Sequence, residues 1–357
     1  MTADGQQIGP DPGGRPRRAN VLEVARLAGV SAATVSRVMN GTARVAEVTA
    51  QRVQAAIETL AYQPAPQARH LRTGKSGNIA LIVPSITNPF FPELVASLHT
   101  EVAERGYALL LVDSAQPEAE AWRVARARLA DGIIIVGSAA VSSARALLAP
   151  PDVPVVAIDR RPAGLAAPIV QVDNFQGARD VVRHLGAAGH RRIGFIGGPR
   201  GMTVSADRAR GYRAALRELG ADAPSGLVTA GGFDEDSGYA AMGQLLATGL
   251  KITAVFAAND IMAIGAMSAL RERGIAVPGQ VAVAGFDGIN LGRYVVPSLT
   301  TYAQPIAQLA RSAVQNLAAG IGAPDRWHPE RDAAPGRALK LRGEVVIRDS
   351  TITPRSR

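Results

Sequence analysis

The sequence contains no cysteine among its 357 residues. Disulfide frameworks, thiolate metal sites and cysteine nucleophiles are therefore excluded. Aromatic residues make up only 4% of the chain. The histidines are scattered without the spacing that a metal site requires, at His70, His99, His184, His190 and His328. His184 and His190 are expected to be structural, on a helix and at its end. The sequence predicts no cofactor and no metal.

Long apolar runs are also missing. The longest, such as Ile133 to Val136, have the length of a strand and fall far short of the roughly 18 residues that a membrane helix needs. Residues 1–18 are rich in Gly, Pro and Arg and hold no apolar stretch. We therefore expect residues 1–19 to form a disordered basic tail and not a signal peptide. A cytoplasmic protein with no membrane partner is predicted.

Acidic residues are outnumbered, with 30 Asp and Glu against 39 Lys and Arg, for a net charge of +9. The basic excess is concentrated near the N-terminus, because residues 1–76 hold ten basic and five acidic residues. More than half of the net charge thus lies in about a fifth of the chain. A basic head of this kind favours contact with phosphates, so nucleic acid is the expected partner.

Three short helices are predicted in the head, over residues 21–28, 32–39 and about 47–60. Asn20 is a good N-cap for the first helix, and Gly29 can end that helix in a tight turn. Ser31 is expected to cap the second helix. A short turn containing glycine between the first two helices is the arrangement that a helix-turn-helix domain requires.

From residue 78 onward the sequence pattern changes, and strand-like apolar runs alternate with amphipathic helical stretches. This alternation predicts βαβ units and parallel sheets. The strand-helix pattern restarts at Arg192–Ile196 much as it began at Asn78–Ile82. Two doubly wound lobes therefore fit the sequence better than one sheet. Ligands of such folds bind beyond the carboxyl ends of the strands, here in the cleft between the lobes.

The segment VLEVARLAGVSAATVSRVMNG, from Val21 to Gly41, closely resembles the helix-turn-helix of the lac repressor (LacI/GalR) family. The resemblance continues in the hinge-like Tyr62-Gln63-Pro64 and Ala68-Arg69-His70-Leu71. Further on it includes Asn88–Phe91, Val172–Asn174, Gly189–Ile193, Ala258–Asp260, Gly285–Asp287 and Pro297–Thr301. Each motif alone is weak, but their order and spacing are highly specific and extend from residue 20 to residue 351.

The resemblance implies a sequence-specific transcriptional regulator, expected to be a repressor, with a small all-α head and an α/β bilobal sensor like the periplasmic binding proteins. The helix-turn-helix domain is expected over residues 20–62, and a hinge helix and linker over 63–77. The first sensor lobe is expected to hold residues 78–174 and 305–334, and the second 175–304 and 335–357. A homodimer on a pseudo-palindromic DNA operator is expected; the sequence does not decide between dimer and tetramer.

The resemblance also implies which residues meet DNA. Ala32, Ala33 and Arg37 would reach base edges from the second helix of the head. Arg37 can donate two hydrogen bonds to a guanine, worth about 1–3 kcal/mol of discrimination, and the alternative is a solvated surface arginine. The alanines offer only apolar contacts. Three polar residues are expected to contact phosphates or to cap helices, namely Thr34, Ser36 and Asn40.

The hinge motif implies a further DNA contact by Arg69 and Leu71. Leu71 has little core to join, so the resemblance implies that it inserts into the minor groove with its twofold mate and kinks the DNA. Packing on the sensor lobe is the alternative. Two residues depart from the family pattern. Ala46 stands where a Ser or Thr usually caps the third helix, and Ala65 stands where an Asn usually follows the hinge proline.

Family members that bind sugars or purines imply an effector site in the sensor. Phe90 or Phe91, with one of the two expected in the core, and Phe233 would stack on an apolar ring face. Three residues would hydrogen-bond hydroxyls or ring nitrogens of a sugar or nucleoside-like effector, namely Arg208, Asn259 and Asp287. The alternatives are a strand-end cap for Asp287 and a solvated helix surface for Arg208. Whether the effector releases or promotes DNA binding stays open.

Two other classes of protein, an enzyme and a periplasmic sugar receptor, fit parts of the sequence. Gly74-Lys75-Ser76 imitates the end of a phosphate-binding loop, but Arg69 occupies the place of the required glycine and no strand precedes it. No G-x-S-x-G elbow is present, so an enzyme is not expected. A periplasmic sugar receptor would share the sensor, but the basic head and the missing signal peptide argue against it.

Overall fold

The computed structural model describes residues 19–40, 45–62, 75–137, 153–160, 167–221, 224–323 and 338–352. Contacts divide the chain into two units, residues 1–76 and 77–357. Within the ranges described, no helix is both long enough and apolar enough to cross a membrane.

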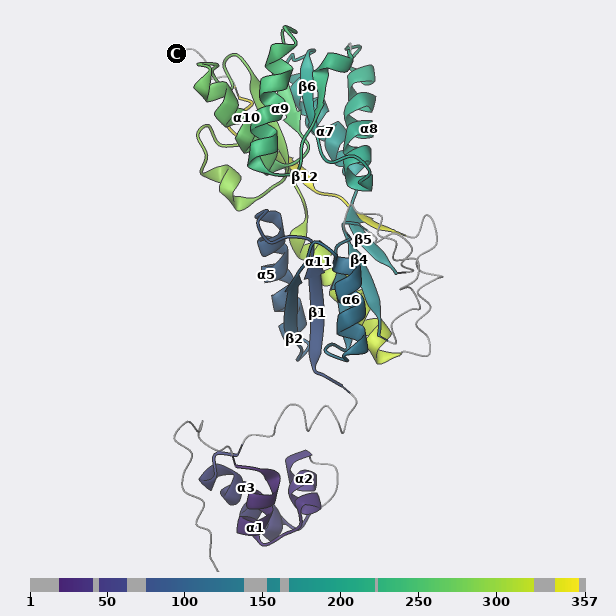
Figure 1. Cartoon of the computed structure of the whole chain (residues 1–357), viewed down its shortest axis with the longest axis vertical. Helices are drawn as coiled ribbons and strands as arrows, with labels where there is room; N and C mark the ends of the chain where they lie inside the picture. Colours follow the sequence, from purple (N-terminus) through teal and green to yellow (C-terminus); the bar gives the residue numbers. More distant parts are fainter. Residues whose placement is uncertain are drawn as a thin grey trace, which may run out of the picture. The chain divides into compact units, whose positions relative to one another are not determined.

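In the residues of the head that the structure describes there are three helices, α1 (Val21–Ala28), α2 (Ala32–Asn40) and α3 (Glu47–Thr59) (Figure 1). The predicted cap of α1 is confirmed, because the Asn20 side chain accepts from the backbone of Leu22 and Glu23 while Glu23 accepts from the Asn20 backbone. Gly29 ends α1 with a φ of +64°, as predicted. The Ser31 hydroxyl accepts from the Thr34 backbone at 3.2 Å and caps α2. Local sequence signals therefore determine where these helices begin and end.

The third helix of the head lacks a side-chain cap. Ala46 occupies its N-cap position and makes no side-chain hydrogen bond, as the sequence predicted. The helix is held by packing instead, since Val53 is fully buried against Val24 and Val35 in a small apolar core. The head therefore depends on this core more than a capped three-helix unit would.

The first sensor lobe is built on a six-stranded sheet in the order β11-β5-β4-β3-β1-β2, and all of its pairings are parallel. Its strands are β1 (Asn78–Val83), β2 (Ala108–Asp113), β3 (Gly132–Ile135), β4 (Val155–Ile158), β5 (Ile169–Val172) and β11 (Leu339–Leu341). On one face, Ile79 and Leu81 of β1 share a core with α5 (Phe90–Ala103) and α11 (Ile306–Gly322). On the other face, Ala80 and Ile82 share a core with α6 (Pro117–Arg126). Burial on both faces explains why the strands read as continuous apolar runs.

The second sensor lobe repeats this plan with a sheet in the order β12-β10-β9-β8-β6-β7. Its strands are β6 (Ile193–Gly197), β7 (Val228–Ala230), β8 (Ala254–Ala257), β9 (Ala282–Asp287), β10 (Thr300–Ala303) and β12 (Glu344–Val346). The β10–β12 pair is antiparallel and the others are parallel. Two helix pairs cover the sheet (Figure 1), α7 (Asn174–Ala187) with α8 (Thr203–Glu218), and α9 (Glu235–Ala247) with α10 (Asp260–Glu272). Short 3-10 turns lie at η2 (Ser225–Leu227) and η3 (Asn290–Arg293).

Two histidines of the second lobe have structural partners, as expected. His184 Nε2 lies 2.9 Å from the Thr351 hydroxyl, and His190 Nδ1 lies 3.0 Å from the Thr253 hydroxyl. Burial lowers the pKa of both imidazoles. Both side chains therefore tie secondary-structure elements together.

The chain passes between the two lobes three times. It leaves the first sheet after β5, returns to the first lobe after β10, and crosses again between β11 and β12. The first two crossings lie beside residues 174 and 304. The third lies at residues 342–343, later than the expected boundary at 335, because Leu339–Leu341 pair with β5 and extend the first sheet.

Candidate functional site

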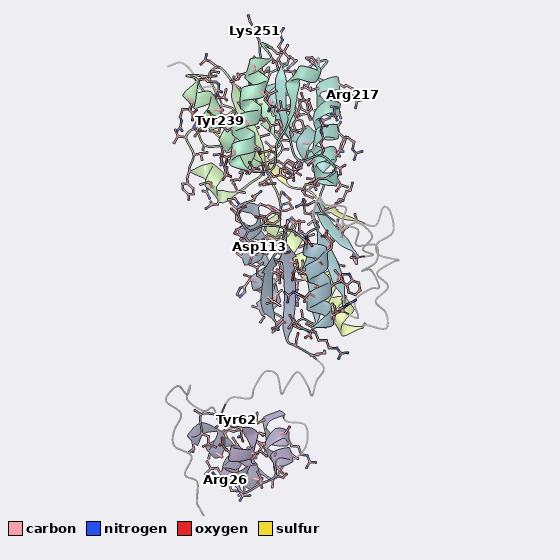
Figure 2. All side chains as sticks on the ribbon, viewed as in Figure 1. Arg26, Tyr62, Asp113, Arg217, Tyr239 and Lys251 are labelled. Carbon is pink, nitrogen blue, oxygen red and sulfur yellow. The ribbon has the colours of Figure 1, made fainter. Side chains whose placement is uncertain are left out.

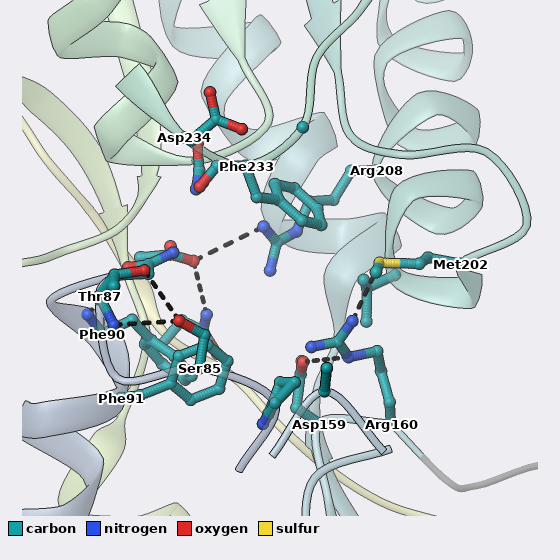
Figure 3. Close-up of a pocket in the computed structure, with 18 residues that line it drawn as sticks. Ser85, Thr87, Phe90, Phe91, Asp159, Arg160, Met202, Arg208, Phe233 and Asp234 are labelled. Carbon is teal, nitrogen blue, oxygen red and sulfur yellow. Dashed lines mark hydrogen bonds and ion pairs between the residues drawn. The ribbon is translucent and has the colours of Figure 1, made fainter. Parts of the chain in front are cut away.

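A cavity of about 500 Å³ lies between the two sensor lobes (Figure 3). Its walls are formed by residues that follow the carboxyl ends of strands in both lobes, which is where doubly wound folds bind ligands. The structure brings together at this cavity all six residues that the sequence suggested for an effector, namely Phe90, Phe91, Arg208, Phe233, Asn259 and Asp287.

Arg208 reaches the cavity from α8 and is held on several sides. Its Nε donates to the Asn174 side chain at 2.8 Å, and its Nη1 donates to the Ala258 carbonyl at 2.5 Å. Its guanidinium lies 3.8 Å from the centre of the Phe286 ring. The side chain is only 4% exposed, and burial lowers its pKa. A solvated helix surface is therefore excluded, and the guanidinium is fixed in orientation before any ligand arrives.

Asp287 ends β9 beside this arginine, with its Oδ1 3.5 Å from Arg208 Nη1. The Gln304 side chain donates to the same oxygen at 2.8 Å. Burial raises the pKa of Asp287 to about 8, although Arg208 acts in the opposite direction, and the neighbouring Asp260 adds to the rise. A carboxyl with this pKa can donate or accept a hydrogen bond near neutral pH.

The alternative role for Asp287, capping the end of its strand, is performed by Asp260. Asp260 accepts from the backbone of Gly288 and Ile289, at 2.8 and 2.9 Å, and from the Thr301 hydroxyl. Asp260 thus holds the turn that follows β9. Asp287 does not hold this turn and lines the cavity.

Asn259 also lines the cavity, but its amide serves the fold. Its Oδ1 caps α10 by accepting from the Met262 backbone at 3.0 Å, and its Nδ2 donates to the Phe233 carbonyl at 3.3 Å. Phe233 adopts a positive φ of +71°, which is unusual for a residue other than glycine. Asn259 therefore fixes the backbone that presents this ring.

The two phenylalanines of α5 both line the cavity, and both also belong to the core of the first lobe. Their rings are 5.3 Å apart and nearly perpendicular, at 72°. The sequence left open which of Phe90 and Phe91 lines the cavity and which lies in the core; each of them does both. Figure 3 shows these rings on one side of the cavity and Phe233, from the second lobe, on the other.

Several polar residues of the cavity wall were missed from the sequence, among them Asp159, Arg160 and Gln304. Asp159 and Arg160 directly follow β4, and an acidic-basic pair after an apolar strand was the available signal. Asp159 Oδ1, Arg160 Nε and Gln304 Oε1 are buried and make no hydrogen bond within the described residues. Leaving such a group unsatisfied costs about 1–3 kcal/mol. Unsatisfied groups on a cavity wall indicate contacts that a ligand would complete.

Backbone strain is concentrated at the same place. Five residues other than glycine have a positive φ in the described chain, and three of them, Asp159, Phe233 and Asp287, line the cavity. Such conformations cost roughly 1–3 kcal/mol each and persist where the surrounding structure imposes them. Their grouping supports a binding role for the cavity.

The cavity wall has no excess of positive charge. Arg160 Nε lies 3.3 Å from Asp159 Oδ2 and Arg208 Nη1 lies 3.5 Å from Asp287 Oδ1, while Asp234 adds a carboxylate at the exposed rim. With Asp287 protonated, the charges of Asp159 and Asp234 still cancel those of the two arginines, so no cation is left in excess for an anionic ligand. No group of three or more His, Asp or Glu side chains in the described ranges could hold a metal ion. The arrangement suits an uncharged ligand with several hydroxyl groups and an apolar face.

On the head, the structure separates the residues suggested for DNA contact. Ala33 and Arg37 are exposed one turn apart on α2, whereas Ala32 is half-buried against the core. Thr34 Oγ1 lies 3.0 Å from the Ser31 hydroxyl at the start of the helix, and Ser36 is half-buried. The side chain of Asn40, and all of Arg69 and Leu71, lie outside the described residues.

Comparison with known proteins supports the assignment of both the head and the sensor. Residues 20–65 match the family described as bacterial regulatory proteins, lacI family, and residues 182–351 match the periplasmic binding protein-like domain. The chain is 35% identical to the ribose operon repressor of Escherichia coli (strain K12) over 303 residues, 84% of this chain and 92% of that protein. It is also 35% identical to the HTH-type transcriptional repressor CytR of the same strain, over 93% of this chain and 96% of that protein.

Solved structures give the same picture. A transcriptional regulator CelR–cellobiose complex superposes with a TM-score of 0.69 at 31% identity, covering 93% of this chain and all of that one. The lac repressor dimer bound to operator and the anti-inducer ONPF gives a TM-score of 0.79 at 24% identity, over 94% of this chain and 100% of that chain. This second likeness concerns the fold alone.

Proposed function

The chain belongs to the lacI family of bacterial regulatory proteins and is therefore a DNA-binding transcriptional regulator. We propose that a neutral sugar bound between its sensor lobes controls its affinity for the operator. The observation that carries this proposal is the balanced, partly unsatisfied set of polar groups in the inter-lobe cavity. We propose that the protein is a repressor without catalytic activity that acts in the cytoplasm, because the relatives compared are named as repressors.

The polar groups favour a sugar over an anionic metabolite. A phosphate or carboxylate ligand would need an uncompensated cation, but Arg160 lies 3.3 Å from the Asp159 carboxylate and the acidic side chains of the cavity wall are at least as many as its two arginines. Sugar hydroxyls both donate and accept, so they can satisfy Asp159 Oδ1, Arg160 Nε and Gln304 Oε1 together. The phenylalanine rings supply surfaces for the apolar face of a sugar ring.

The names of the relatives narrow the class of sugar. One is a ribose operon repressor and one structure holds cellobiose, so pentoses, hexoses and their short oligomers are the first compounds to test. Nucleosides share the furanose ring and form the second set. A nucleoside effector would place its base among the same aromatic rings.

The DNA-binding side of the proposal rests on the exposed face of α2. Ala33 and Arg37 project from the same face of that helix, as a recognition helix requires. One such helix reads few bases, so we propose a homodimer on a pseudo-palindromic operator. The lac repressor structure named above is a dimer on its operator.

The test uses the full chain and has two readouts. Thermal shift with neutral sugars, nucleosides and the matching sugar phosphates should find stabilisation by a neutral compound, since a ligand at 100 times its Kd adds about 2.7 kcal/mol. The compound found should then alter operator binding in gel shifts. Stabilisation by sugar phosphates only, or by none of the compounds, would contradict the proposed effector class.

The variant Asp159→Asn separates effector binding from DNA binding. It removes the charge of a carboxylate whose Oδ1 makes no hydrogen bond and whose Oδ2 lies 3.3 Å from Arg160 Nε, with little change in shape, so affinity for the effector should fall about ten- to hundredfold. Operator binding without effector should stay unchanged. A variant that binds the sugar as tightly as wild type would remove Asp159 from the site.

A further inference from the structure

A second cavity, of about 360 Å³, lies within the second lobe between α8 and the strands β6 and β7. The edge strand β7 contributes Val228, Thr229 and Ala230, and the end of β6 with the loop after it contributes residues 197–202. The effector cavity and this one share only Met202. The second cavity is therefore a separate feature of the lobe, and the function proposed above does not use it.

Unsatisfied hydroxyl groups line this second cavity. Ser205, in the first turn of α8, is only 7% exposed, and its Oγ makes no hydrogen bond within the described residues. Thr229 Oγ1, on the facing strand, is buried and unsatisfied in the same way. A Cβ at Gly198 would collide with the Phe233 ring and with the Ser205 hydroxyl, so the glycine leaves room for both side chains. Two buried donors facing one space indicate a missing acceptor.

The N–H groups at the start of α8 also lack an acceptor from a capping side chain. The N-cap residue, Met202, caps no N–H group of the helix with its side chain, because its Sδ accepts instead from Arg160 Nη1 at 2.9 Å. The first-turn N–H groups of a helix carry a partial positive charge and bind anions when no side chain caps them. Ser205 lies within this turn, so its hydroxyl and the first-turn N–H groups lie at the same end of the helix.

The formal charges lining the cavity are all positive. Arg200 and Arg213 line it, and no acidic residue does. Within the described residues neither arginine forms an ion pair, whereas Arg210 on the same helix pairs with Asp207. Ser205, Ala209 and Arg213 follow one another at intervals of four residues, so they occupy one face of α8. This pattern differs from the effector cavity, where each arginine has a carboxylate.

We propose that this cavity is an anion site that binds the phosphate group of a small metabolite, and inorganic phosphate itself. Ser205 Oγ and Thr229 Oγ1 donate to phosphate oxygens, the first turn of α8 faces the anion, and Arg200 and Arg213 neutralise its charge. Phe195, Ala206 and Ala209 form an apolar wall for the organic part of a phosphate ester.

Calorimetric titration of the full chain with inorganic phosphate at constant ionic strength tests the site. Wild type should bind phosphate saturably, with one site per chain. Ser205→Ala and Arg213→Gln should each weaken binding about tenfold, as expected for a lost charge-assisted hydrogen bond. Ser205→Ala removes a hydroxyl without a partner, so its thermal unfolding should match that of wild type.

Arg217→Gln is the matched control. Arg217, labelled in Figure 2, lies one turn beyond Arg213 on the same helix, is exposed, and does not line the cavity. It should bind phosphate as wild type does, which separates the site from general attraction to a basic surface. Absence of saturable binding by wild type, full binding by Ser205→Ala and Arg213→Gln, or an equal loss in Arg217→Gln would each overturn the proposal.

Discussion

Replacement of Asp287 by Asn should change how the stability of the protein depends on pH. Burial raises the pKa of this carboxyl from 3.8 to about 8 in the folded chain. The folded state therefore keeps a proton that the unfolded state loses, and the stabilisation from that proton is lost as pH rises from about 4 through about 8. Each pH unit in this window is worth about 1.4 kcal/mol. Asn does not titrate, so from about pH 5 to pH 8 the variant should gain on the order of 4 kcal/mol relative to wild type.

Urea unfolding followed by far-UV circular dichroism between about pH 5 and pH 9 measures this difference. The gain should stop above about pH 8, where both states of the wild-type chain are ionised. His184 and His190 titrate in both proteins, so their contributions cancel. Asp260→Asn is the matched comparison, because burial raises the pKa of Asp260 only to about 6 and its gain should end near that pH. A difference between Asp287→Asn and wild type that is constant over the whole range would refute the argument.

Three further predictions concern the head and hinge. Arg37→Ala should weaken binding to the specific operator by about 1–3 kcal/mol and relax the preference at one symmetric base pair, which binding-site selection would detect; an unchanged preference would rule out base contact. Leu71→Ala should lower operator affinity and DNA bending together while leaving sugar binding intact, and an equal bend in a circular-permutation assay would contradict the wedge role. Ala46→Ser should supply the cap that α3 lacks and stabilise the head by about 1 kcal/mol in thermal unfolding; no gain would mean that the N–H groups at the start of α3 are satisfied in another way.

Features set by neighbours along the chain were predictable from the sequence. The caps at Asn20 and Ser31 and the turn at Gly29 depend on residues within one helical turn, and all three are found in the structure. Strands such as β5 and β11 are harder to predict, because each is only 3–4 residues long. Such short runs carry too little periodicity to stand out, and pairing with a neighbouring strand creates them.

The cavity was predicted less completely than the head, for a related reason. Asp159 and Gln304 lie far apart in the sequence and meet only because β4 and β10 end at the same cleft. Neither residue belongs to a local motif. An Asn before a helix is a strong N-cap signal, and the Asn259 side chain is used that way. Its predicted contact with the effector stays a prediction.

The placement of the unsatisfied groups suggests how a ligand acts on the sensor. Asp159 and Arg160 belong to the first lobe, Arg208 and Asp287 to the second, and Gln304 lies on the crossing from β10 to α11. A ligand shifts the balance between two arrangements of the lobes only by its difference in affinity for them. Hydrogen bonds to Asp159 Oδ1, Arg160 Nε and Gln304 Oε1 that form in one arrangement alone, at about 1 kcal/mol each, make that difference roughly a hundredfold. Because Gln304 also holds Asp287 at 2.8 Å, a sugar bound to its free oxygen acts on both lobes and on the segment that joins them.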